Sequence, residues 1–302
     1  MFEYMKVLTL RARYECMESG LLPEYLGSTI RGILGHCIHD FFCHYKDKKC
    51  FICEERETCL YTKSFSNTGS KEGAVNSYAI YIYGHGKGKW EKGDHCIFDI
   101  NLFGTGTEYA GVYLDALIAA EQKGWGARRL SFRLLQIVDP YSEKLIYTGG
   151  MSLTRNLNPM ALSIKGRKAK TVCLIFDTPL RIVSSGELFR KLPFDMLIRF
   201  LTRRITLLTN KYTDACLEWD IEEMIARAAA VKTVEESWRE VHFTRYSINS
   251  QGKKLELASK IGWILYEGDI SEFVPVLEAG KYLHIGKGTT IGFGNYEVYY
   301  DK

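Results

Sequence analysis

The sequence lacks any apolar run long enough to cross a membrane as a helix, for which about 18 residues are needed. Charged side chains stand among residues 1–6, before any apolar run, so no signal peptide is visible. Neither sign of charge dominates, since 40 basic residues accompany 36 acidic ones and the net charge is +4. We therefore expect a cytoplasmic protein without a membrane partner, in which any nucleic-acid surface is a local patch.

The sequence also lacks the even cysteine count of a disulfide framework. It has nine cysteines and no secretory signal, which favours a reducing compartment with free thiols or a metal site. A length of 302 residues is enough for two ordinary domains. Hydrophobic residues make up 46% and charged residues 25%, the composition of a globular chain that forms buried cores.

Two common phosphate-binding motifs are missing. The segment 284–296, HIGKGTTIGFGNY, contains four glycines, but it has neither the Walker pattern nor the dinucleotide spacing. One interpretation is a tight glycine turn that binds nothing. The other is a concavity of free backbone N–H groups that binds phosphate beside Lys287, because glycine lets another backbone come close.

The first half of the chain shows the order strand, helix, strand, strand, helix, strand. Apolar residues recur at helical spacing between residues 28 and 44, which predicts an amphipathic helix there. The other expected elements are strands at 2–16, 75–83, 96–103 and 130–138 and a helix at 109–122.

The second half repeats this order. We expect strands at 171–182, 241–248, 255–266 and 296–300 and helices at 194–212, 221–231 and 271–283. Two βαββαβ units predict an α+β fold of tandem ferredoxin-like (RRM-like) domains with antiparallel sheets. The expected divisions are an N-terminal domain at 1–140 with a cysteine-cluster insertion at 43–59, a linker at 141–170, and a C-terminal domain at 171–302 with the glycine-rich loop.

Three stretches carry a family likeness. Residues 243–269 begin FTRYSINSQGKKL, residues 277–296 end in the glycine-rich loop, and residues 28–36 read STIRGILGH. Together they resemble the CRISPR-associated endoribonucleases of the RAMP superfamily that cut precursor crRNA. The pairing of RYSINSQGKKL with the glycine-rich loop is the specific part, since the loop alone is a weak signal. The resemblance implies cleavage of repeat RNA that gives mature crRNA.

Members of this family generally take the catalytic histidine from the region of the first helix. On a helical wheel, His36 and His39 lie away from the apolar stripe and are neighbours, with Gly32 and Gly35 on the same side. A helix face with two glycines has few protruding side chains and would let an RNA backbone approach closely. The ordinary alternative is two solvated surface histidines. The expected catalytic residues are His36 first and His39 second, followed by His44 and Lys46.

Cleavage without a metal requires a base for the ribose 2′-OH, an acid for the leaving 5′-oxygen, and positive charge at phosphorus. The products would carry 2′,3′-cyclic phosphate and 5′-hydroxyl ends. The expected RNA-binding residues are Arg31, Arg245, Lys253, Lys254, Gly286, Lys287, Gly288, Gly292, Phe293 and Gly294, with Phe293 stacking on a base. Arg199, Arg203 and Arg204 could extend the patch or form a solvated helix face.

The expected partners are CRISPR repeat RNA and crRNA, with other CRISPR effector subunits and a homodimer as further candidates. The alternative function is a catalytically inert RAMP subunit that binds crRNA within an effector complex. A third alternative is a metal-stabilised RNA-binding protein outside CRISPR.

The cysteines cluster in one short segment. Four of them, Cys43, Cys50, Cys53 and Cys59, give the spacing C-x6-C-x2-C-x5-C. Four soft ligands can complete a tetrahedral zinc site or hold an iron–sulfur cluster, and four reduced thiols in a loop are the other interpretation. We expect the site, if metal is present, to be structural, with no cofactor needed for catalysis. The remaining cysteines are expected in the core.

Overall fold

The computed structural model describes residues 1–46, 48–65, 75–184, 186–246 and 254–301, and the side chains of 244–246 and 254–255 lie outside this description. The chain divides into two compact units. Residues 6–160 form the N-terminal unit, and residues 161–302 together with residues 1–5 form the C-terminal unit. Each unit is described by itself.

The N-terminal unit contains an antiparallel sheet in the order β3–β5–β1–β6, the order of a ferredoxin-like βαββαβ motif, so the predicted fold is confirmed here. β7 and β8 extend the sheet beyond β6. The strands are β1 (Lys6–Cys16), β3 (Tyr78–Ile82), β5 (His95–Phe103), β6 (Phe132–Asp139), β7 (Lys144–Thr148) and β8 (Met151–Ser152).

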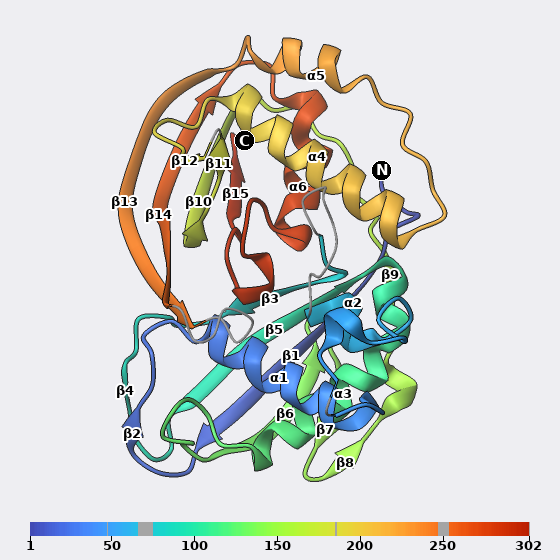
Figure 1. The fold of residues 1–302 in the computed structure, drawn as a ribbon. Coiled ribbons are helices and arrows are strands. Elements are labelled where there is room, and N and C mark those ends of the chain that lie inside the picture. Colours follow the sequence, from blue (N-terminus) through green and yellow to red (C-terminus); the bar gives the residue numbers. More distant parts are fainter. Residues whose placement is uncertain (47, 66–74, 185, 247–253, 302) are drawn as a thin grey trace. The chain divides into compact units, whose positions relative to one another are not determined.

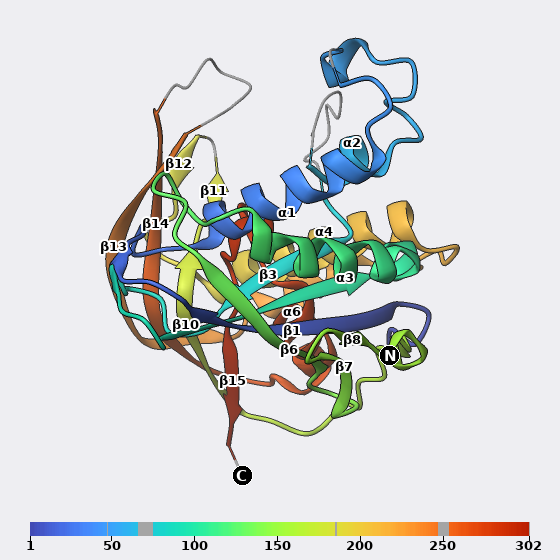
Figure 2. The same cartoon turned by 90° about the horizontal axis from the view of Figure 1, so that it is seen from below.

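Two helices cover one face of this sheet (Figures 1 and 2). They are α1 (Gly27–Phe42) and α3 (Ala110–Ala119), and the short turns η2 (Gly104–Tyr109) and η3 (Ala120–Gln122) flank α3. The apolar stripe of α1 is buried as its spacing predicts, including Ile30, Leu34 and Ile38. A further helix that the pattern does not predict, α2 (Leu60–Phe65), contacts α1.

Aromatic rings fill the core of the N-terminal unit. The Trp125 ring stacks on Phe132 at 4.3 Å between centroids and meets Tyr14 edge-on at 4.9 Å. The Tyr14 hydroxyl donates to the Leu117 carbonyl in α3, so the polar end of this ring is satisfied inside the core. These contacts join the central strand β1 to a covering helix.

The segment 141–170, expected as a linker, contains ordered elements. β7 and β8 lie within it, followed by η4 (Thr154–Asn156) and β9 (Met160–Ala161). The boundary between the two units lies at residues 160 and 161.

The C-terminal unit repeats the topology, with the antiparallel order β13–β14–β10–β15, and confirms the second ferredoxin-like domain. In Figure 1, α4 and α6 lie on one side of this sheet. The elements are β10 (Thr171–Leu180), α4 (Phe194–Tyr212), α5 (Ile221–Ala228), β13 (Lys232–Tyr246), β14 (Lys254–Glu267), α6 (Val274–Leu283) and β15 (Glu297–Tyr300).

The bounds of α4 agree with the prediction because Pro193 fixes its start. Pro193 is the N-cap of the helix and has extended backbone angles. Strand β13, by contrast, begins nine residues before the predicted start at 241, at Lys232. Most residues of its first part are exposed, so the apolar alternation that marks a half-buried strand is missing there.

The remaining short elements are β2 (Gly20–Leu21), β4 (Lys89–Trp90), β11 (Val183–Ser184), β12 (Glu187–Leu188), η1 (Cys50–Ile52), η6 (Ser271–Phe273) and η7 (Thr289–Ile291).

Helix α6 packs closely on its neighbours at Gly280. A Cβ atom added there would lie 2.0 Å from the Tyr296 hydroxyl oxygen and 2.6 Å from Leu201 Cδ2. The Tyr296 hydroxyl donates to the Leu277 carbonyl at 2.7 Å, so it is fixed in place. Only glycine fits this position.

We expect Gly280→Ala to lower the free energy of unfolding by about 1–3 kcal/mol, because the added methyl group overpacks the core. Gly111→Ala in α3 is the matched control, since a Cβ there meets no atom within 4 Å. Alanine in this open helical position should stabilise by up to about 1 kcal/mol. Denaturant unfolding measures both, and equal stability of the two variants would contradict the packing argument.

Candidate functional site

The glycine-rich loop, residues 284–296, connects α6 to β15 and folds onto the end of β10. The Gly294 N–H donates to the Pro179 carbonyl at 2.9 Å, and the Lys287 N–H donates to the Arg181 carbonyl at 2.8 Å. N–H groups satisfied within the protein are those of His284, Ile285, Lys287, Ile291, Gly292, Phe293, Gly294 and Asn295. The expectation of a run of free N–H groups through the loop is therefore wrong for most of its length.

The loop's glycines have conformations and contacts that a side chain would disturb. Gly294 has a φ of 76°, and a Cβ there would lie 1.8 Å from the Ile285 carbonyl oxygen. Gly286 has a φ of 79°, and its Cβ would lie 2.6 Å from the Arg181 carbonyl oxygen. Gly288 and Gly292 also have positive φ. These glycines are required by the loop's own fold, whatever it binds.

One part of the loop keeps unsatisfied donors. The N–H groups of Gly286, Gly288, Thr289 and Thr290 have no acceptor within the described ranges. The Lys287 side chain between the two glycines is exposed and forms no ion pair within those ranges. A phosphate group would therefore meet donors at residues 286–290 and not along the rest of the loop.

Phe293 does not have the exposed ring that base stacking requires. Its exposed fraction is 0%, and its ring centroid lies 5.4 Å from that of Phe243 in β13. A Cβ at Gly288 would lie 2.8 Å from Phe293 Cδ2, so the ring also packs against the loop. The expectation that Phe293 binds a base is wrong for this conformation, and its position indicates a structural contact.

His284 at the start of the loop is fully buried and neutral. Its Nδ1–H donates to the Phe293 carbonyl at 3.1 Å, which leaves Nε2 to accept from the Asn295 amide at 3.3 Å. Burial, helped by the nearby Arg204 guanidinium, lowers the pKa of His284 to about 3. Its backbone angles (φ 60°, ψ 173°) are ones that glycine adopts almost alone, so the contacts hold a strained residue.

Arg204 lies beneath the loop and not on the surface, contrary to the expectation for the arginines of this helix. Its exposed fraction is 7%, and Nε donates to the Leu283 carbonyl at 2.6 Å, at the last residue of α6. Burial lowers the pKa of Arg204 to about 10. His284 and Asn295 are not among the predicted site residues, although both belong to the family-like stretch.

The side of α1 that was expected to carry both glycines and both histidines is open in one part and covered in another. Gly35 is buried, and a Cβ there would lie 3.0 Å from the Phe65 ring of α2, whereas a Cβ at Gly32 meets nothing within 4 Å. His36, four residues after Gly32, is exposed. His39, four residues after Gly35, is half-buried against the Tyr61 ring at 4.9 Å. The expectation of one open face with both glycines and both histidines is wrong, because α2 covers the side of Gly35 and His39.

The other residues expected near the helix have different surroundings. His44 lies beyond the end of α1 and forms an exposed ion pair, with Nδ1 3.3 Å from Glu55 Oε2. Lys46 is exposed. Arg31 donates from Nη2 to the Phe65 carbonyl at 2.8 Å and lies over the Phe65 ring. Arg31 therefore holds α2 to α1, and its assignment as an RNA-binding residue stays a prediction.

The remaining RNA-binding residues lie at the far end of the β13–β14 pair. Arg245 pairs with Leu255 and Lys254 pairs with Tyr246 in the antiparallel register. The side chains of Arg245 and Lys254, and the whole of Lys253, lie outside the described residues.

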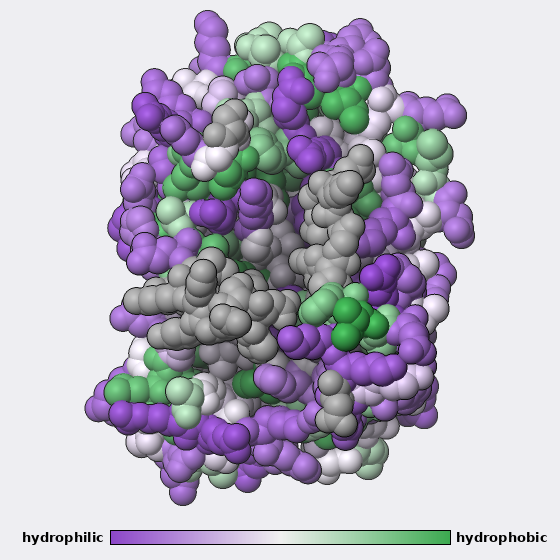
Figure 3. Space-filling model, in the orientation of Figure 1, coloured by the Kyte–Doolittle hydropathy of each residue, from purple (hydrophilic) through white to green (hydrophobic). Residues whose placement is uncertain are grey.

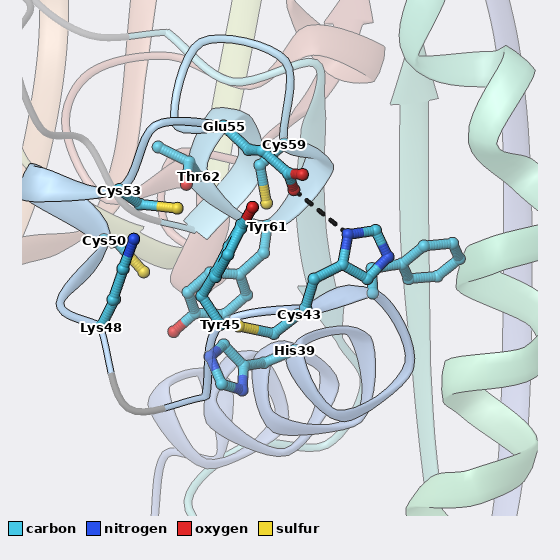
Figure 4. A pocket seen from close by; sticks show the side chains of 12 residues that line it. His39, Cys43, Tyr45, Lys48, Cys50, Cys53, Glu55, Cys59, Tyr61 and Thr62 are labelled. Carbon is cyan, nitrogen blue, oxygen red and sulfur yellow. Dashed lines mark ion pairs between the residues drawn. The ribbon is translucent and has the colours of Figure 1, made fainter.

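The cysteine segment, residues 43–59, places its four thiols around one small cavity, with His39 and Tyr61 also in the lining (Figure 4). Burial raises the pKa of the Cys50 thiol, and the neighbouring thiols raise it further. Within the described ranges, no three histidine, cysteine or acidic side chains are spaced to hold a metal ion. Among the other cysteines, Cys16, Cys37 and Cys96 are buried, whereas Cys216 is exposed and does not belong to the core.

The surface near this segment is partly hydrophobic. Phe41, Phe42, Phe51 and Ile52 are between 40% and 62% exposed. Figure 3 shows hydrophobic side chains at the part of the surface where Figure 1 has α2. In the described part of the chain, no helix is both long and apolar enough to span a membrane.

Two family models match the chain. Residues 5–159 match a model described as an N-terminal domain, and residues 174–296 match that of the CRISPR-associated endoribonuclease Cas6. Residues 174–296 therefore contain a Cas6-family domain. A comparison with curated proteins found no match.

Solved Cas6 structures share the fold. A Thermus thermophilus Cas6 is 10% identical, with a TM-score of 0.59 over 98% of this chain and 99% of its own. A Cas6 product complex is 13% identical, with a TM-score of 0.60 over 97% and 100%. A partial Cas6-RT-Cas1–Cas2 complex is 8% identical, with a TM-score of 0.64 over 98% of this chain. The present chain spans 46% of that last chain and 29% of the chain in a second such complex.

The buried His284 predicts a pH dependence of stability. An unfolded histidine titrates near pH 6.5 and the folded one near 3, so between these values only the unfolded chain binds the proton. The contribution of neutral His284 to the free energy of unfolding is therefore complete above pH 6.5. It is lost as the pH falls toward 3, at no more than about 1.4 kcal/mol per pH unit.

His284→Asn isolates this effect, because the amide can donate to Phe293 but does not titrate. The difference in unfolding free energy between wild type and His284→Asn should narrow as the pH falls from 7 to 4. Parallel pH profiles for the two proteins, measured by denaturant unfolding, would show that His284 is not buried neutral.

Proposed function

We propose that the chain cleaves CRISPR repeat RNA in precursor crRNA without a metal, by general acid–base catalysis, and that it leaves 2′,3′-cyclic phosphate and 5′-hydroxyl ends. The observation that carries the proposal is His36, an exposed histidine beside the open Gly32 on the first helix of a fold shared with solved Cas6 structures. An imidazole is the side chain best suited to gain or lose a proton near neutral pH.

Side chains alone can supply both proton transfers that the reaction needs. The ribose 2′-oxygen loses its proton to a base and forms a bond to phosphorus, and the bond from phosphorus to the 5′-oxygen breaks as that oxygen takes a proton from an acid. His36 is assigned one of these two proton transfers. His39 and His44 are the weaker candidates, because one is packed against Tyr61 and the other is paired with Glu55.

The glycine-rich loop is assigned to RNA binding through residues 286–290. Lys287 supplies the positive charge, and the N–H groups of Gly286, Gly288 and Thr289 supply hydrogen-bond donors to phosphate oxygens. Phosphate contacts position the RNA without reading its sequence. Recognition of the repeat sequence is therefore assigned to other parts of the chain. Other CRISPR subunits and a second copy of the chain are further proposed partners.

His36→Ala should slow cleavage by about 10²-fold or more and leave RNA affinity nearly unchanged, because it removes a proton-transfer group and not a phosphate contact. Single-turnover cleavage and filter binding on repeat RNA in EDTA measure the two effects. His39→Ala and His44→Ala test the order of the candidates. Normal cleavage by all three variants and by their triple combination would contradict the assignment to this helix.

The same assay tests the mechanism. A 2′-deoxy nucleotide at the scissile position should abolish cleavage and spare binding, and the product should end in a 2′,3′-cyclic phosphate. A strict requirement for Mg²⁺ would overturn the metal-independent mechanism. Tight binding of repeat RNA with no cleavage under any of these conditions would favour the inert crRNA-binding subunit instead.

Lys287→Ala should weaken RNA affinity and reduce the slope of log affinity against log salt by about one, as expected for one lost phosphate contact. Lys144→Ala is the matched control, since it removes an exposed lysine at the start of β7 in the other unit. Binding measured at several salt concentrations distinguishes the two. An unchanged slope in Lys287→Ala, or the same loss in Lys144→Ala, would show that the loop lysine makes no phosphate contact.

A further inference from the structure

The cysteine segment has no hydrophobic core of its own. Between residues 39 and 61, none of the described residues is buried. Its ion pairs, such as His44 with Glu55 and Lys48 with Glu54, are exposed, and exposed ion pairs contribute little to stability. A segment of this length without buried apolar contacts needs another source of stability to adopt one conformation.

The segment turns its cysteines inward and its apolar side chains outward. Phe51 and Ile52, between Cys50 and Cys53, are 54% and 62% exposed, whereas both cysteines are half-buried. The thiols line the central cavity in Figure 4. Hydrophobic burial alone would favour the opposite arrangement, because phenylalanine and isoleucine gain more from leaving water than a thiol does.

The four cysteines lie in three parts of the segment, and an ion bound by all four would connect these parts. Cys43 is the C-cap of α1, where its N–H donates to the His39 carbonyl and its extended backbone angles end the helix. Cys50 and Cys53 lie at the two ends of the turn η1, and the Cys53 N–H donates to the Cys50 carbonyl. Cys59 directly precedes α2, where the Lys63 N–H donates to its carbonyl.

The cavity between the thiols has a volume of about 20 Å³. This is enough for one water molecule or one metal ion. Thiolates are soft ligands that favour zinc, and four of them complete a tetrahedral structural site.

We propose that Cys43, Cys50, Cys53 and Cys59 bind a single zinc ion with a structural role. No three such side chains stand at metal-binding spacing in the described ranges, so binding requires the thiols to turn further into the cavity. Rotation of half-buried cysteine side chains about χ1 allows this movement. The ion would tie the end of α1 to the start of α2.

The position of α2 is what such a site would secure. Phe65 of α2 accepts the hydrogen bond from Arg31 and covers Gly35, and Tyr61 covers His39. These contacts determine which face of α1 is open. The zinc site would thus act on the shape of the surface around His36, and no step of the RNA chemistry passes through the ion.

The test measures metal directly and does not depend on RNA cleavage. The full chain, expressed with zinc and purified without chelator, should contain about one zinc per molecule by elemental analysis. Replacement by Co²⁺ should give the visible absorption of a tetrahedral cobalt–thiolate centre. Cys53→Ser should lose the metal, whereas Cys216→Ser, which changes an exposed cysteine elsewhere, should retain it.

A second measurement covers the case in which Cys53→Ser does not fold. Trypsin digestion of the wild-type chain should cut the cysteine segment faster after a chelator removes the metal, and Zn²⁺ alone should restore protection. Absence of zinc together with no Co²⁺ spectrum would overturn the proposal. Full retention of metal in Cys53→Ser would overturn the ligand assignment, and about two or more irons per chain would indicate an iron–sulfur cluster in its place.

Discussion

Strand β10 is hydrogen-bonded along both edges, and the architecture of the C-terminal unit depends on this pairing. β14 lies on one side and β15 on the other, so the last strand of the chain must return beside the first strand of its unit. The glycine-rich loop is the segment that makes this return. Its backbone bonds to the carbonyls of Pro179 and Arg181 follow from its place beside the end of β10. The glycines are needed because the returning chain approaches other backbone too closely for a Cβ.

The buried polar groups beneath the loop complete this anchor. Arg204 ties α4 to the last carbonyl of α6, and His284 joins the next residue to Phe293 and Asn295. A neutral histidine satisfies both hydrogen bonds, since a protonated Nε2 would face a donor and the Arg204 charge. The strain in the His284 backbone is therefore offset by contacts inside the protein. These buried contacts hold in place the part of the loop, residues 286–290, that is proposed to contact RNA.

The spacing of apolar residues and the positions of proline and glycine allowed most of the fold to be predicted. They did not show the surroundings of individual side chains. Pro193 marked the start of α4, and the apolar spacing of residues 28–44 marked α1. The helical wheel gave the direction of His36 and His39 from the helix axis, yet it could not show that α2 covers one of these directions. α2 is only six residues long and lies in a segment dominated by cysteines and charges, so its pattern was too short to recognise. Phe293 was misassigned for the same reason, because tertiary contacts decide whether an aromatic side chain is free.

The division of the chain into units has a consequence for the order of folding during synthesis. The N-terminal unit is one continuous stretch, residues 6–160, so it can fold as soon as that stretch has left the ribosome. Residues 1–5 are made before this stretch but belong to the other unit, where the Met5 carbonyl accepts from the Leu162 N–H and the Met1 amino group donates to the Ile164 carbonyl. These five residues must wait until more than 150 others have been made before their partners exist. These five residues are thus synthesised before the N-terminal unit but reach their final place after it.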